Sequence, residues 1–170
     1  MLSPLKLWTC RLLFLAGLSG GSAEVRVGDV FPSLRAAGLA GGELPATAGK
    51  VVLVDFWASW CAPCKASFPA FARLHQACGP GGLVIVAVSV DEKPAAYAAF
   101  VKKLNPPFAT LHDREQKLVR AVEVPVMPTS YLLDRNGRVR FLHQGYHGTE
   151  TDLELRQEID QLLAETPTSP

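Results

Sequence analysis

Two continuous apolar runs lie in the middle of the chain. Residues 51–57 read VVLVDFW and residues 83–90 read LVIVAVSV, and both are rich in β-branched side chains. Runs without regular polar alternation are typical of strands that are covered on both faces. We therefore predict two central strands of a parallel or mixed α/β sheet.

Helical spacing follows each of these runs. Over residues 62–78 the apolar positions recur every three or four residues, until the glycine-rich stretch 79–82 ends the pattern. Residues 94–104 and 115–122 are predicted to form two further helices, with a short strand over 108–112 between them. The alternation of strands and helices indicates βαβ units.

The last third of the chain changes its period. An Asn-Gly pair at 136–137 separates two strand-like runs, 129–133 and 138–142, and this predicts a β-hairpin. Residues 149–164 carry an amphipathic stripe that predicts a closing helix. Before the first central strand, the Gly- and Ala-rich residues 24–50 are expected to form short edge strands and turns.

The first residues differ from the rest. A basic start is followed by the apolar run 12–18 and by the small residues 19–23. This order describes a secretory signal peptide over residues 1–23, cut after Ala23. An uncleaved anchor is the alternative, although the run is far shorter than the ~20 residues of a spanning helix. Export predicts an oxidising location, the periplasm or a similar extracytoplasmic space.

Composition and charge narrow the possible partners. With 170 residues, of which 48% are hydrophobic, the chain has the size and core of one domain, expected over residues 24–170. The 17 Lys and Arg residues nearly balance the 16 Asp and Glu residues. The sequence therefore gives no indication of a nucleic-acid partner or of a polybasic membrane patch.

Cys61 and Cys64 form a C-x-x-C pair, which supplies only half of the ligands of a zinc site. His75 and Cys78 do not complete it, because fourteen helical residues separate Cys64 from Cys78 by roughly 21 Å. Only the fold could bring in the other histidines, which are His112, His143 and His147. We therefore expect neither a metal nor another cofactor.

Redox chemistry explains the pair better. The first central strand delivers Cys61 to the start of a helix, where free N–H groups and the helix dipole favour a thiolate. Cys64 lies one helical turn on and can close a disulfide with it. Pro63 suits the first helical turn, where its missing N–H costs little. Cys61 is then the attacking thiol and Cys64 the buried resolving thiol.

The segment VDFWASWCAPCK resembles the active-site segment of the thioredoxin superfamily. Over about residues 28–164 the chain resembles the exported TlpA/ResA-like branch, related to the redoxins and to cytochrome c maturation thioredoxins. The features that carry this likeness are the extension before Val51 and the strand-helix insertion between Val90 and Pro128. The resemblance implies a thioredoxin-like fold, with a central mixed sheet flanked by helices, and thiol-disulfide exchange.

The resemblance also assigns a role to Asp55, six residues before Cys61. In the family a buried carboxylate at this position exchanges a proton with the second cysteine, here Cys64. An acid within an apolar strand should have its pKa raised by desolvation, so that it can accept a proton near neutrality. A satisfied structural carboxylate at a strand end is the alternative.

Pro128 matches the family's cis-proline, which lies against the cysteines and leaves the preceding backbone free to pair with a bound peptide. Met127 would then line the substrate groove, with ordinary loop packing as the alternative. Trp60 would cover Cys61, and the two residues between the cysteines, Ala62 and Pro63, complete the expected substrate contacts.

The chain departs from the patterns of three related groups of proteins, and these departures bear on its function. Cytochrome c maturation members commonly carry a glutamate three residues after the second cysteine, where this chain has Ser67. A redoxin-type peroxidase would have a threonine three residues before its cysteine, and this chain has Ala58. Thioredoxin-fold copper carriers have three residues between their cysteines instead of two. Cys78 is expected to be a half-buried helix residue, with a regulatory thiol as the alternative.

The direction of electron flow is predicted from the residues between the cysteines. Strong oxidants of the family carry a histidine there that stabilises the thiolate, whereas Ala62 and Pro63 offer no such donor. We therefore expect a disulfide reductase that acts on oxidised exported proteins. A membrane thiol protein would supply its electrons. If the N-terminus stays uncleaved, it would attach the chain to the membrane.

Overall fold

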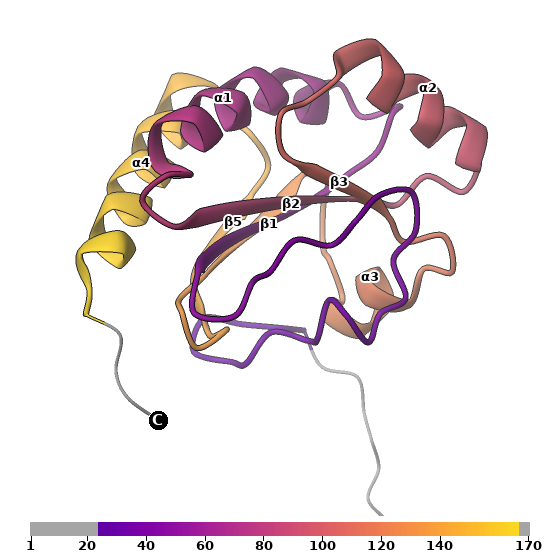
Figure 1. The fold of residues 1–170 in the computed structure, drawn as a ribbon. Coiled ribbons are helices and arrows are strands. Elements are labelled where there is room, and N and C mark those ends of the chain that lie inside the picture. Colours follow the sequence, from indigo (N-terminus) through magenta and orange to yellow (C-terminus); the bar gives the residue numbers. More distant parts are fainter. Residues whose placement is uncertain (1–23, 167–170) are drawn as a thin grey trace, which may run out of the picture.

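The computed structural model describes residues 24–166, so the predicted signal peptide over residues 1–23 lies outside the described part. Helices and strands alternate along most of the chain (Figure 1). They are β1 (Val51–Trp57), α1 (Ala62–Cys78), β2 (Leu83–Ser89), α2 (Pro94–Leu104), β3 (Ala109–His112), α3 (Lys117–Val122), β4 (Thr129–Leu133), β5 (Val139–Gln144) and α4 (Thr149–Ala164).

The strands form one five-stranded sheet in the order β3-β2-β1-β4-β5. β1 pairs in parallel with β2, and β2 with β3, whereas β4 runs antiparallel to both β1 and β5. The sheet is therefore mixed, as predicted. Every residue of β1 is buried, which is the burial that its continuous apolar run predicts.

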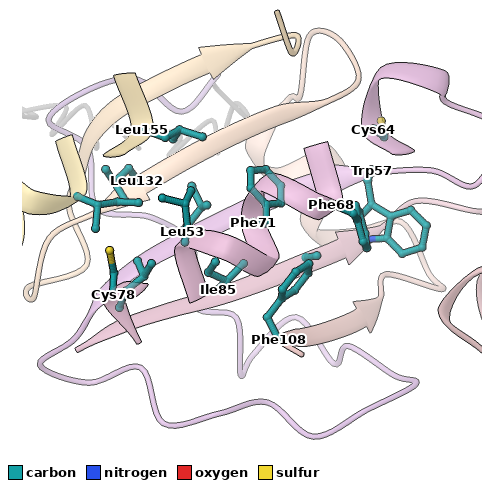
Figure 2. Packing of buried hydrophobic residues seen from close by; sticks show 14 of the residues in the cluster. Leu53, Trp57, Cys64, Phe68, Phe71, Cys78, Ile85, Phe108, Leu132 and Leu155 are labelled. Atoms are coloured by element: carbon teal, nitrogen blue, oxygen red, sulfur yellow. The ribbon is translucent and has the colours of Figure 1, made fainter. Parts of the chain in front are cut away.

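Helices cover both faces of the sheet (Figure 1). Side chains of α1, α2 and α4 pack with alternate sheet residues in one cluster, which contains Trp57 and Cys64 (Figure 2). On the opposite face, α3 and the segment before β1 enclose a second cluster around Phe56 and Tyr131. Since neighbouring strand residues point to opposite faces, Phe56 and Trp57 belong to different clusters.

The predicted edge strands in residues 24–50 are wrong. This segment forms turns and only two isolated bridges, Val30 to Arg138 beside β5 and Ala40 to His112 beside β3. Gly28, among other glycines of the segment, has a positive φ, here 97°. Such a conformation interrupts an extended chain, because it turns the backbone away from the direction of a strand.

The insertion between β2 and β4 consists of α2, β3 and α3. The helix predicted from residue 115 begins at Lys117, because Gln116 adopts a left-handed conformation with φ 56°. Both carboxylate oxygens of Asp113 accept hydrogen bonds at this end, from the N–H groups of Lys117 (2.9 Å) and Val119 (2.8 Å). Asp113 thus satisfies two of the free amides of a helix start.

Cys78, the last residue of α1, is more deeply buried than expected, with 4% of its surface exposed. Burial raises the pKa of its thiol, and this effect exceeds the opposing influence of Arg156. Cys64 and Cys78 lie at opposite ends of the labelled cluster (Figure 2).

Within residues 24–166, no helix combines the length and hydrophobicity that crossing a bilayer requires.

Candidate active site

Cys61 and Cys64 form a disulfide at the start of α1, with an S–S distance of 2.01 Å. Cys61 is the N-cap of the helix, and its Sγ atom accepts a hydrogen bond from the N–H of Cys64 at 3.2 Å. Pro63 lies within the first helical turn. The predicted pairing and the predicted place of Pro63 are both confirmed.

The two cysteines differ slightly in their exposure to solvent. Cys61 retains 5% of its surface exposed, whereas Cys64 is fully buried at 0%. The first turn of α1 contains no acidic residue. A negative charge on Cys61 therefore meets the positive end of the helix dipole without an opposing carboxylate in that turn. The geometry suits Cys61 to be the thiolate that meets a partner.

A carboxylate just after β2 anchors the loop that carries Cys61. Both oxygens of Asp91 accept the backbone N–H of Ser59 at 3.1 Å, and its Oδ1 also accepts the Ser59 hydroxyl at 2.8 Å. The hydroxyl of Ser89 donates to Oδ2 at 2.8 Å. Asp91 has only 2% of its surface exposed. Buried side-chain hydrogen bonds that form a network hold their members in place, so this network fixes the approach to Cys61.

Asp55 lies in the middle of β1 and is fully buried. Residues two apart in a strand point to the same face, so Asp55 shares its face with Leu53 and Trp57. Both of these pack in the cluster that contains Cys64. The hydroxyl of Ser130 donates a hydrogen bond to its Oδ1 at 2.6 Å, and Oδ2 has no hydrogen-bond partner among the described residues. Burial raises the pKa of Asp55 from 3.8 to about 7, against the lowering effect of the Ser130 hydrogen bond.

The raised pKa of Asp55 predicts an unusual dependence of stability on pH. The unfolded chain loses the Asp55 proton near pH 4, but the folded chain keeps it until about pH 7. The free energy of unfolding should therefore fall as the pH rises across this window. The pKa change corresponds to about 4 kcal/mol, an upper bound for the cost of burying the ionised group.

We expect an oxidised Asp55→Asn variant to be more stable than the parent at pH 8, by up to about 4 kcal/mol. At pH 4 the two proteins should differ by less than about 1 kcal/mol, because the carboxyl is then neutral in the folded chain and only about half ionised in the unfolded chain. Urea denaturation at the two pH values measures this difference. A difference that stays constant with pH would mean that Asp55 titrates normally.

The bond between Met127 and Pro128 is cis, as the resemblance implies. Pro128 is buried, and its carbonyl accepts a hydrogen bond from the N–H of Gly145 at 2.8 Å. Met127 is partly buried and packs against the cluster that includes both cysteines of the pair. The neighbouring Val126 is 45% exposed. The cis-proline segment thus packs Met127 against this cluster and leaves Val126 on the surface.

Trp60, Ala62 and Pro63 form the exposed rim of the site. The Trp60 residue is 69% exposed, so it lies outside the core. Two surface hollows lie beside this rim, and Ser59 and Ala96 contribute to the lining of both. The structure therefore joins Cys61 to Cys64, packs Met127 against the cluster that contains them, places Asp55 on the same face of the sheet, and leaves Trp60 facing solvent.

Sequence reasoning missed Ser130 and Asp91. Ser130 pairs directly with Asp55 across the β1–β4 ladder. Aligning the run 51–57 against 129–133 as antiparallel neighbours would have brought the two side chains to one face. Asp91 had a weaker signal, an acid immediately after a buried strand.

The described residues contain no cluster of three or more His, Cys, Asp or Glu side chains arranged to hold a metal ion. His143 is instead engaged by carboxylates, with Nε2 2.6 Å from Glu158 and Nδ1 3.6 Å from Glu154. His112 places Nε2 2.6 Å from the carbonyl oxygen of Asp91.

Known proteins share both the sequence pattern and the fold. The sequence model of the Redoxin family matches residues 26–159. The thiol-disulfide oxidoreductase ResA of Geobacillus thermodenitrificans is 30% identical over 140 residues, covering 81% of this chain and 79% of that protein. ResA of Bacillus subtilis is 35% identical over 97 residues, covering 57% of this chain and 54% of that protein.

A solved structure extends this likeness to the fold. The crystal structure of a protein assigned as thiol:disulfide interchange protein DsbE from Chlorobium tepidum superposes with a TM-score of 0.75 at 32% identity. The match covers 83% of this chain and 100% of that chain. The chain therefore belongs to the redoxin family of the thioredoxin superfamily, in its TlpA/ResA-like branch, and is a thiol-disulfide oxidoreductase.

Proposed function

We propose that this protein is a disulfide reductase of exported proteins. The proposed direction of electron flow rests on the hydrogen bonding of the Cys61 sulfur. Within residues 24–166, the one recorded donor to its Sγ is the N–H of Cys64. Ala62 and Pro63 carry no side-chain donor, so the reduced thiolate gains less stabilisation than a histidine would give. A dithiol whose reduced form is weakly stabilised is a better electron donor.

In the proposed reaction, the Cys61 thiolate attacks one sulfur of a substrate disulfide. A mixed disulfide forms, and the other substrate sulfur leaves as a thiolate. Asp55 then accepts the proton of Cys64, and the Cys64 sulfur attacks Cys61. The bond between Cys61 and the substrate breaks as the Cys61–Cys64 disulfide forms. Two electrons pass to the substrate, and the Asp55 proton returns to a substrate thiolate or to solvent.

The exposed rim supports a protein substrate. Trp60, Ala62 and Pro63 are exposed and lie within two residues of Cys61, the cysteine that retains some exposure. We place Met127 and cis-Pro128 on the other side of the site, where they would provide an apolar side chain and a fixed backbone. The bond between them is cis, and Met127 packs against the cluster that contains both cysteines. An extended segment around a substrate disulfide would contact both sides. An exposed tryptophan beside hollows is a common anchor for protein partners.

The proposed location is the periplasm or a similar extracytoplasmic space. The predicted signal peptide over residues 1–23 supports this location, with an uncleaved anchor as the alternative. An oxidising compartment would also supply disulfides for the enzyme to reduce. Each turnover leaves Cys61 and Cys64 oxidised, so the enzyme needs a thiol donor. We propose a membrane protein that passes electrons across the bilayer to this pair.

The reduction potential of the Cys61–Cys64 pair tests the proposed direction. Equilibration of the domain with thiol buffers, followed by tryptophan fluorescence, would measure it, because Trp60 adjoins Cys61 in the sequence. We expect a value below about −220 mV, toward the potentials of thioredoxins. A value near about −120 mV, as in strong oxidants, would reverse the proposed electron flow. Absence of a two-electron transition would favour copper binding instead.

Two other activities receive less support from the site. A role in cytochrome c maturation would be expected to use a glutamate at position 67, but Ser67 is buried and donates to the Cys64 carbonyl at 2.9 Å. A peroxidase would use a threonine hydroxyl at position 58, where Ala58 has none. Consumption of hydrogen peroxide by the reduced protein would move the peroxidase to first place.

A further inference from the structure

A polar row crosses the sheet on the face that carries α1 and α4. Asp55 of β1 pairs with Ala87 of β2 on one side and with Ser130 of β4 on the other. Ser130 pairs in turn with His143 of β5. Directly paired residues project to the same face of a sheet. Ser130 therefore separates the buried carboxylate of Asp55 from the imidazole of His143.

The hydroxyl of Ser130 donates to Asp55, and a donated hydrogen bond favours the ionised form of a carboxylate. Ser130 is itself only 4% exposed, so its hydroxyl is committed to this contact inside the core. The bond occupies Oδ1 and leaves Oδ2 without a hydrogen-bond partner in the described part of the chain. One oxygen is thus held while the other remains able to accept a proton.

Other titratable groups on this face have different partners. The Nε2 atom of His143 lies 2.6 Å from Glu158 of α4, and its Nδ1 atom lies 3.6 Å from Glu154. From α1 the face receives the cysteine pair, and β2 contributes Ala87. α4 contributes Thr151, which accepts the N–H of His147, and the apolar Leu155. The influences on the Asp55 pKa are burial and Ser130, with no charged side chain among them.

On the assumption that Asp55 is the base for Cys64, we propose that Ser130 is a positioning residue for that proton transfer. Its hydroxyl fixes Oδ1 and stabilises the ionised carboxylate, so that Oδ2 takes the proton from the Cys64 sulfhydryl. The Cys64 sulfur then keeps the electron pair of its S–H bond and uses it to attack Cys61. Ser130 itself gains and loses no proton in this step.

Removal of the hydroxyl should raise the pH at which Asp55 ionises. In the oxidised protein the carboxyl band in infrared spectra, identified by its loss in Asp55→Asn, should titrate near pH 7. In Ser130→Ala we expect that midpoint to rise by about one pH unit, since a hydrogen bond to a charged group is lost. Ser130→Thr keeps the hydroxyl and should titrate like the parent.

The same shift should appear in the kinetics of exchange. Reduced protein reacting with the uncharged bis(2-hydroxyethyl) disulfide should close its own disulfide about tenfold more slowly in Ser130→Ala at pH 6. The rates should converge at a pH well above both midpoints, because Asp55 is then ionised in both proteins. General destabilisation would instead lower the rate without moving the midpoint.

Two control variants separate these effects. Thr151→Val removes another buried hydroxyl, on α4, whose hydrogen bond is to the N–H of His147 and not to Asp55. It should leave the midpoint unchanged. His143→Gln removes the nearest imidazole of the row and should also leave it unchanged. If the midpoint moves in His143→Gln but not in Ser130→Ala, the inference about Ser130 is overturned.

Failure of the inference differs from failure of the proposed function. If Ser130→Ala titrates like the parent while Asp55→Asn still alters the pH profile of exchange, Ser130 has no positioning role and Asp55 remains the base. If Asp55→Asn leaves that profile unchanged, Asp55 is not the base, and the role of Ser130 falls with it. A midpoint that rises in Ser130→Ala, together with slower exchange at pH 6, supports both Asp55 as the base and Ser130 as its positioning residue.

Discussion

Cys61→Ser should abolish disulfide reduction, with a loss of turnover of at least about 10³-fold. Cys61 is the cysteine of the pair that retains exposure, and its sulfur lies at the N-terminus of α1. A serine hydroxyl at this position has no accessible anion near neutral pH, so the first attack on a substrate disulfide cannot occur. Reduction of insulin disulfides, with dithiothreitol as the electron source, measures the loss.

Cys78→Ala provides the matched control for Cys61→Ser. Cys78 lies on the same helix but outside the disulfide, and it is buried. Its removal should leave the rate of insulin reduction within about twofold of the parent, apart from any loss of stability from the small cavity. Residual activity of Cys61→Ser above about a tenth of the parent would show that another thiol can make the first attack.

Cys64→Ser should trap the enzyme on its substrates. The first attack by Cys61 remains possible, but the fully buried Cys64 sulfur that resolves the mixed disulfide is missing. Turnover should fall by at least about 10²-fold, because release then depends on an external thiol. Protein-sized mixed disulfides through Cys61 should accumulate. Non-reducing electrophoresis and mass spectrometry of the linked peptides would detect them and identify the substrates.

The double variant Cys61→Ser/Cys64→Ser controls for adducts formed through Cys78. It should form no mixed disulfide under the same conditions. If Cys61→Ser traps substrates and Cys64→Ser does not, the roles of the two sulfurs are exchanged. That result would contradict their difference in exposure, so the comparison tests the site geometry directly.

The fold was predictable where the sequence determines local structure. The continuous runs that became β1 and β2 are long, apolar and rich in β-branched residues, and they indicated buried strands without further information. The periodicity over 62–78 predicted α1 to its observed bounds. In residues 24–50 the predicted turns are present but the predicted edge strands are wrong, because apolar positions suggested strands while four of the five glycines adopt positive φ values.

The active site was predictable only in part. The cysteine pair, Asp55 and Pro128 lie in short motifs, so their sequence context was sufficient to single them out. Ser130 contacts Asp55 from 75 positions away along the chain. Such a contact depends on the register of β1 against β4, which residue types alone do not specify. The family pattern therefore located the groups for which we propose a role in the reaction, but not the hydroxyl that bonds to Asp55.

The two bridges made by residues 24–50 have a consequence for self-association. At one end of the sheet, the N–H and C=O groups of Ala40 both bond to His112 of the outermost strand β3, at 2.9 and 2.8 Å. At the other end, Gly28 and Asp29 bond to both backbone groups of Val139 at the start of β5. Unpaired edge strands are templates for aggregation between chains. A segment without strands of its own thus occupies part of both edge strands. It blocks their backbone groups at these positions from pairing with the sheet of another copy.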